Sequence, residues 1–203
     1  MIDEGYIKYQ CRWIHSPSVQ THDIKEINKW RNRFYKLGLI GVYSNGISFG
    51  NISIRYGKAG QFLISGTQTG NLLSLSEYHY TLVTSFELAR NFLTCEGPVK
   101  ASSESLTHAA IYNAHLEINA VIHVHHLEMW ERLMNKVPTS SRDFSYGTPE
   151  IAKEIIRLFK EDNLMEKKIL VMGGHEEGII SFGRNLKEAG KILLKYYYYS
   201  CRW

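Results

Sequence analysis

The chain has 203 residues, of which 44% are hydrophobic and 22% are charged, so it can bury a sizeable core without disulfides. Its formal net charge of +4 comes from both signs spread along the chain, which gives no argument for nucleic-acid binding. No apolar stretch is long enough to span a membrane, no secretory signal pattern opens the sequence, and the three cysteines form no closely spaced pair. We therefore expect a cytoplasmic protein with reduced thiols, and neither nucleic acid nor membrane as its partner.

Apolar periodicity predicts a succession of helices and short strands. In chain order these are a helix over 23–37, strands over 50–55 and 61–65, helices over 77–93 and 103–115, a strand over 119–124, a helix over 149–159, strands over 168–172 and 178–182, and a helix over 185–198. The order is not a clean βαβ alternation, so we expect a three-layer α/β/α domain with a central, mostly antiparallel or mixed sheet. This single domain would cover residues 1–203, with 1–22 as an N-terminal extension and 196–203 as a C-terminal tail.

The strongest local signal for chemistry is Ile122-His123-Val124-His125-His126. Side chains two residues apart in a strand point to the same face, so His123 and His125 project together while Val124 faces the core. Two adjacent imidazoles are a good start for a metal site, but an isolated His-x-His is more typical of a histidine-rich strand end, because a metal needs a third ligand. His126 points the other way and is expected to be a supporting or surface residue.

His175 is the candidate for that third ligand. It follows the predicted strand 168–172 across Gly173-Gly174, a pair that lets the backbone turn sharply and bring the next side chain close to other elements. Glu176 and Glu177 come directly after it. Burying two like charges would be costly, so at least one of them should face water or a cation.

A carboxylate and two hydroxyls lie where the predicted helix 103–115 begins. Ser102 or Ser103 can cap that helix, and the free N–H groups there favour an anion. Glu104 is either stabilised by the helix dipole or used as a metal-proximal general base, and the segment alone favours the first interpretation. His108, one turn further on, is more typical of a histidine that packs within the fold.

Two glycine-rich stretches, Ser48 to Arg55 and Ile64 to Gly70, combine small residues, hydroxyls and exposed amides. Loops of this kind bind phosphate without a Walker motif, although each stretch alone is also typical of a polar turn between strands.

Together and in this order, the motifs resemble the class II aldolase and adducin family, from near residue 25 to the C-terminus. The resemblance rests on Gly50-Asn51-Ile52-Ser53-Ile54-Arg55, Ser65-Gly66-Thr67-Gln68-Thr69-Gly70, Ser102-Ser103-Glu104 with His108, His123-Val124-His125, Tyr146-Gly147-Thr148-Pro149, and His175 before Gly178. Each motif is weak alone, but the ordered set is specific.

The resemblance implies a class II aldolase-like fold and a metal-dependent lyase. Such an enzyme cleaves or forms a carbon–carbon bond in a small phosphorylated hydroxyketone through a metal-stabilised enediolate. His123, His125 and His175 would be the ligands of Zn2+, with manganese, cobalt or iron left open. Glu104 would be the acid/base residue.

The same resemblance implies a phosphate site and an assembly. Asn51, Ser102, Ser103 and the Thr69-Gly70 turn would hold the substrate phosphate. Family members are usually homotetramers with active sites at subunit interfaces, where a C-terminal tyrosine of a neighbour, here one of 196–199, helps with proton transfer.

Three departures from the family pattern bear on the substrate. His175-Glu176-Glu177-Gly178 stands where the family has His-Gly, so two residues are inserted beside a predicted metal ligand. The segment between His125 and Tyr146 is shorter than in the sugar-phosphate aldolases. The loop from Ser65 to Gly70 is one residue longer, which leaves Ser65, Gly66 or Thr67 as alternatives to Thr69 and Gly70.

Other functions remain open at this point. A sugar-phosphate 4-epimerase would use the same scaffold, although that branch typically carries Asp where Glu104 stands. A methylthioribulose-phosphate dehydratase is a second enzymatic alternative. A non-catalytic, adducin-like interaction module is a third hypothesis. The presence of the three histidines argues against it, because the adducin head lacks them.

Overall fold

The computed structural model describes residues 6–201; residues 1–5 and 202–203, at the two ends of the predicted domain, lie outside the described residues. The described part contains a mixed sheet in the order β1-β7-β6-β5-β4-β8-β10-β9 and a separate small hairpin, β2–β3. Its strands are β1 (Gln10–Ile14), β2 (Gly41–Val42), β3 (Ser48–Phe49), β4 (Asn51–Arg55), β5 (Phe62–Ser65), β6 (Tyr80–Glu87), β7 (Phe92–Glu96), β8 (Ala120–His125), β9 (Ile169–Val171) and β10 (Gly178–Gly183). Its α-helices are α1 (Lys25–Lys36), α2 (Ser105–Ala114), α3 (Leu127–Leu133), α4 (Pro149–Glu161), α5 (Leu164–Lys167) and α6 (Leu186–Ser200).

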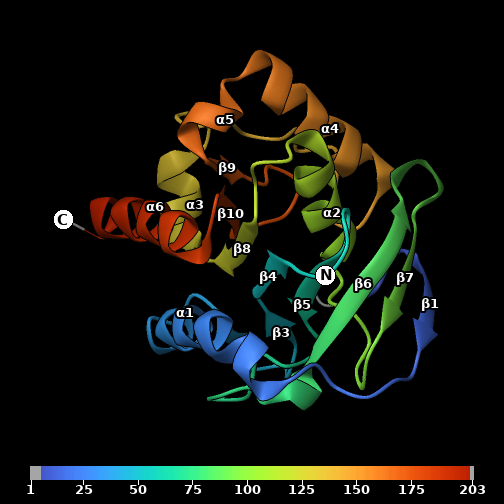
Figure 1. Ribbon diagram of the computed structural model, residues 1–203. Helices are drawn as coiled ribbons and strands as arrows, with labels where there is room; N and C mark the ends of the chain where they lie inside the picture. The colour runs from blue at the N-terminus through green and yellow to red at the C-terminus, as the bar shows by residue number, and fades with distance from the viewer. Residues whose placement is uncertain (1–5, 202–203) are drawn as a thin grey trace.

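Helices cover both faces of the sheet (Figure 1). One apolar cluster joins α1, α3 and α6 to the sheet, and a second joins α2, α4 and α5 to its other face. All pairings in the large sheet are antiparallel except that of β1 with β7, which is parallel. The predicted three-layer α/β/α fold with a mostly antiparallel or mixed sheet is therefore confirmed.

Strand β8 is buried along its whole length near the middle of the sheet. Ile122 and Val124 belong to the cluster that contains α1 and α6. Because side chains alternate along a strand, His123 and His125 project to the opposite face. β8 pairs with β4, which places Asn51 beside His123, and with β10, which places Gly178 beside His125.

The predicted helix over 77–93 is wrong. Glu77–His79 forms a single 3-10 turn, and Tyr80–Glu87 is strand β6, which pairs with both β5 and β7. Its sequence is rich in aromatic and β-branched residues, which favour a pleated, half-buried surface. Pairing on both edges of the strand outweighs the weak helical spacing of its apolar residues.

Most other predicted elements are observed within two residues of their expected bounds. Strand β1, however, lies inside the segment expected to be an N-terminal extension and forms one edge of the sheet beside β7. Helix α6 continues to Ser200, two residues beyond its predicted end, and includes the whole tyrosine run 196–199. Among the described helices none has the length and apolarity needed to cross a membrane.

Candidate metal centre

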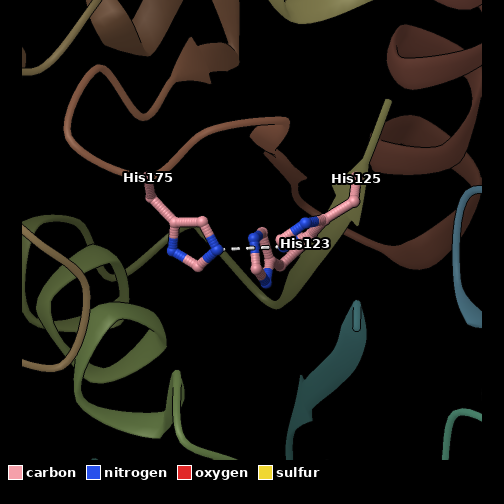
Figure 2. A group of neighbouring side chains, drawn as sticks. All are labelled: His123, His125 and His175. Carbon is pink, nitrogen blue, oxygen red and sulfur yellow. Dashed lines mark hydrogen bonds between the residues drawn. The ribbon is translucent and has the colours of Figure 1, made fainter. Parts of the chain in front are cut away.

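Three buried histidines face one another at the end of β8 (Figure 2). His123 and His125 come from β8, and His175 comes from the turn between β9 and β10. The Nε2 atoms of His125 and His175 are 3.1 Å apart, and one nitrogen from each of the three rings lies within 4.8 Å of the others. All three side chains are buried. The structure therefore brings the three predicted metal ligands together.

Two glycines let the β9–β10 turn lie close enough to deliver His175. A Cβ atom on Gly173 would lie 2.1 Å from the carbonyl oxygen of Ser140, and one on Gly174 would lie 2.3 Å from that of Phe144. The sharp turn expected here is present, because Gly173 and Gly174 are the two central residues of a turn closed by the hydrogen bond from His175 N–H to the Met172 carbonyl at 3.2 Å. Neither glycine has a positive φ, so this turn needs glycine for close backbone packing. The left-handed residue between β9 and β10 is Glu177, with φ of 66°.

The remaining nitrogen of each ring lies next to a different side chain. The contacts join the Asn51 amide to His123 Nδ1 at 3.2 Å, Tyr43 Oη to His125 Nδ1 at 2.9 Å, and Glu104 Oε1 to His175 Nδ1 at 3.2 Å. With the Asn51 amide turned over, its Oδ1, which has no hydrogen-bond partner among the described residues, would accept from His123 Nδ1–H and leave the lone pair on Nε2. Metal-binding histidines almost always have such a partner on the nitrogen that faces away from the metal, because it fixes the orientation of the ring. The arrangement around the three histidines is thus that of a supported ligand set.

The donor set fits a divalent cation. His123 Nε2 is buried and has no hydrogen-bond partner among residues 6–201. Burial, together with the nearby His125 and His175, lowers the pKa of His123 well below its usual value, so this imidazole is neutral at pH 7. A neutral imidazole carries the lone pair that a metal needs, and three imidazoles are the number of protein ligands that a catalytic zinc site uses.

Glu104 lies beside this cluster. It is the residue immediately before α2 and is 1% exposed. Although Oε1 is 3.2 Å from His175 Nδ1, neither carboxylate oxygen accepts a hydrogen bond of good geometry from the residues that the structure describes. A buried carboxylate without hydrogen bonds is costly unless a cation or a proton compensates for it. Its position favours a role next to a metal over that of a simple helix cap.

The residues predicted to hold a phosphate line one cavity of about 190 Å³. These residues are Asn51, Thr69, Gly70, Ser102 and Ser103. Of the three alternatives from the same loop, Gly66 and Thr67 line it too, whereas Ser65 is not among its lining residues. Because Asn51 also contacts His123, the cavity opens directly beside the metal centre.

Arg31 was missed in the sequence and holds a wall of this cavity. Its guanidinium is almost fully buried and donates to the carbonyl oxygens of Thr69 at 3.0 Å, Leu73 at 3.1 Å and Leu72. Burial lowers the pKa of Arg31 from its usual value. The available signal was a charged residue within the apolar face of α1, next to Trp30.

Two other histidines have supporting roles. His126 Nδ1 accepts a hydrogen bond from the backbone N–H of Met129 at 3.1 Å and so caps α3. His108 is fully buried on α2, where its Nδ1 lies 2.6 Å from Ser53 Oγ, and burial lowers its pKa to about 3.

Tyr43 is a second site residue that the sequence analysis missed, because nothing near it in sequence indicates its contact with His125.

Residues 31–131 match the family model described as the class II aldolase and adducin N-terminal domain. The chain belongs to the class II aldolase and adducin family. The matched region of this family member includes Glu104, His123 and His125 and ends before His175. Membership supports an enzyme, and the family usually binds a divalent metal, which the buried histidine cluster can hold.

Solved structures share the same fold at low sequence identity. L-fuculose 1-phosphate aldolase aligns with a TM-score of 0.67 and 17% identity over 90% of this chain and 84% of that chain. YgbL from Escherichia coli aligns with a TM-score of 0.66 and 16% identity over 89% and 87%. A sugar-phosphate aldolase from Thermotoga maritima aligns with a TM-score of 0.62 and 18% identity over 89% and 94%. These similarities confirm the class II aldolase fold.

Proposed function

We propose that this class II aldolase family member is a metal-dependent lyase. It would cleave or form a carbon–carbon bond in a small phosphorylated hydroxyketone. A divalent cation, for which Zn2+ is the first candidate, would be held by His123, His125 and His175. One observation carries the proposal: three buried imidazoles face one another beside the buried carboxylate of Glu104.

Each part of the site has a task in this reaction. When bound, the cation would supply Lewis-acid polarisation of the substrate carbonyl. Glu104 removes the proton from the reacting carbon or returns it, as a general acid/base. The hydroxyls and backbone amides of the cavity hold the phosphate, which lowers the entropic cost of placing the reacting carbon next to Glu104.

We further propose a cytoplasmic homotetramer whose active sites lie at subunit interfaces. Tyr198 and Tyr199, near the end of α6, are 46% and 64% exposed. A tyrosine from the segment 196–199 would then take part in proton transfer in a neighbouring subunit. Light scattering of the purified protein should give the mass of four chains, and a monomer at assay concentration would remove this part of the proposal.

The test of the reaction begins with metal-loaded protein, dihydroxyacetone phosphate and a series of short aldehydes. We expect a new carbon–carbon bond in the product, and weaker activity with unphosphorylated dihydroxyacetone. Glu104→Gln should keep the metal and lower turnover by roughly 100- to 10,000-fold, the usual contribution of a general acid/base.

The outcomes separate this lyase from its rivals. Fully metal-loaded protein that neither forms nor cleaves the bond with any aldehyde would overturn the lyase. Epimerisation, or loss of water from a ketose phosphate without cleavage, would instead assign one of the two other reactions on this scaffold. Full activity of Glu104→Gln would exclude Glu104 as the acid/base.

A further inference from the structure

Glu177 is the second residue of the insertion between His175 and Gly178, and its backbone is in a conformation that glutamate rarely adopts. Its φ is 66°, in the left-handed region that glycine tolerates and other residues avoid. The backbone is held there because the Glu177 carbonyl accepts a hydrogen bond from the N–H of His126 at 3.0 Å. A non-glycine residue held in this region next to a candidate site motivates the hypothesis that its side chain has a use there.

That side chain reaches a predicted metal ligand through a tyrosine. The Tyr43 hydroxyl donates to Glu177 Oε2 at 2.5 Å and lies 2.9 Å from His125 Nδ1. The direct distance from Glu177 Oε2 to His125 Nδ1 is 3.8 Å, which is too long for a hydrogen bond. The contact between the carboxylate and the imidazole therefore runs through the hydroxyl.

The direction of these hydrogen bonds sets the tautomer of His125. A tyrosine hydroxyl has one hydrogen, and Tyr43 donates it to Glu177, so the hydroxyl must accept from His125 Nδ1–H. A neutral imidazole with its hydrogen on Nδ1 carries its lone pair on Nε2. This is the atom that lies 3.1 Å from His175 Nε2, inside the histidine cluster of Figure 2.

Aromatic side chains also restrict the position of the His125 ring. The ring of Phe49 lies 5.5 Å from that of His125, centroid to centroid, and packs 4.5 Å from the ring of Tyr43. Tyr43 opens the turn of the β2–β3 hairpin, and residues 45–47 of that turn line the cavity together with Ser48 of β3. One side chain thus joins a wall of the cavity to a metal ligand.

We propose that Glu177 and Tyr43 are positioning residues that hold His125 with Nε2 facing the cation and thereby tighten divalent-metal binding. The inference rests on the proposed metal site and gives the inserted glutamate a role in it. A carboxylate, a hydroxyl and an imidazole in series act as the outer support that orients a ligand and raises its basicity.

Metal affinity of the 203-residue chain tests this inference without an activity assay. Zn2+ and Co2+ binding would be measured by competition with a chromogenic chelator for wild type, Tyr43→Phe, Glu177→Ala and the double variant. Each single change should weaken binding by roughly 10- to 100-fold, the usual cost of losing an outer-sphere partner. The double variant should bind about as weakly as the weaker single variant, because both residues act through the same nitrogen. The absorption spectrum of bound Co2+ should shift in the same variants.

Two further variants separate positioning from simple structure. Glu176→Ala removes the exposed neighbour in the same insertion and should leave affinity unchanged. Glu177→Gln keeps an acceptor for the Tyr43 hydroxyl and should recover most of the affinity lost in Glu177→Ala.

The results distinguish failure of this inference from failure of the metal site itself. Wild-type affinity in both Tyr43→Phe and Glu177→Ala, or fully additive losses in the double variant, would overturn the relay while leaving the metal site intact. A wild-type protein that binds neither Zn2+ nor Co2+ would overturn both proposals together.

Discussion

The two halves of the candidate site are built in different ways. At the metal end, three side chains from β8 and the β9–β10 turn converge, and another side chain lies within 3.2 Å of one nitrogen of each ring. At the cavity end, the wall consists of loop backbone and hydroxyls, and the 69–73 segment is fixed through its carbonyl groups by Arg31. A single substitution should therefore abolish function at the metal end and only reduce it at the cavity end.

The largest effect should come from His123→Ala. Zinc affinity should fall about a thousandfold, if each ligand carries a similar share of the roughly 10–16 kcal/mol of a structural zinc site. His126→Ala is the matched control: it removes the cap of α3, should cost about 1 kcal/mol of stability and should keep the metal. Chelator competition measures both variants, and full occupancy in His123→Ala would remove that residue from the ligand set.

Arg31→Met should destabilise the wall of the cavity and leave metal affinity unchanged. It leaves the carbonyl groups of the 69–73 segment without their donor, which should lower the free energy of unfolding by about 1–3 kcal/mol. The KM for the phosphorylated substrate should rise roughly tenfold, a loss of about 1.4 kcal/mol, while zinc affinity stays unchanged. Arg33→Met, an exposed change on the same helix, is the control. A parallel loss of zinc affinity in Arg31→Met would show that the two ends are not separable.

The metal end was largely predictable because its signal is local. Strand alternation placed His123 and His125 on one face, and the order of the motifs supplied His175 and Glu104. The supporting residues were not predictable, because Tyr43 meets its partners across 82 and 134 positions of sequence. Only the register of distant elements creates those contacts.

The fold shows the same division between local and distant causes. The amphipathic pattern of α1 and the buried run in β8 were sufficient to predict both elements. Strand β6 was mistaken for a helix, because its pairing with β5 and β7 depends on residues that its own sequence does not specify. The parallel pairing of β1 with β7 escaped prediction for the same reason.

His108 belongs to neither the metal end nor the cavity end of the site, and its effect on the pH dependence of stability can be tested. Its pKa is lowered to about 3 by burial, so below the unfolded-state value of about 6.5 the unfolded chain binds more protons than the folded one. Above that pH the buried, neutral His108 does not lower the free energy of unfolding. As the pH falls from there towards 3, His108 lowers the free energy of unfolding by up to about 1.4 kcal/mol per pH unit. Urea unfolding of metal-free protein between pH 7 and pH 4 should show a shallower decline for His108→Gln. An unchanged slope would contradict burial of a neutral imidazole.

The smallest change in stability should come from Glu177→Gly. Relief of the left-handed backbone should gain about 1–2 kcal/mol, and loss of the hydrogen bond from Tyr43 should cost about 0.5–1.5 kcal/mol, so the two nearly cancel. Zinc affinity should nevertheless fall. Denaturant unfolding that showed a loss of several kcal/mol would identify Glu177 as a structural contact instead.

The central claim is that this chain holds a divalent metal on three histidines, and the metal content of the purified protein tests it most directly. Elemental analysis should find about one metal per chain, as expected for a three-histidine site, and almost none in the triple variant His123→Ala, His125→Ala, His175→Ala. No metal in the wild type, even after incubation with zinc, would contradict the claim and favour a non-catalytic, adducin-like role for the chain.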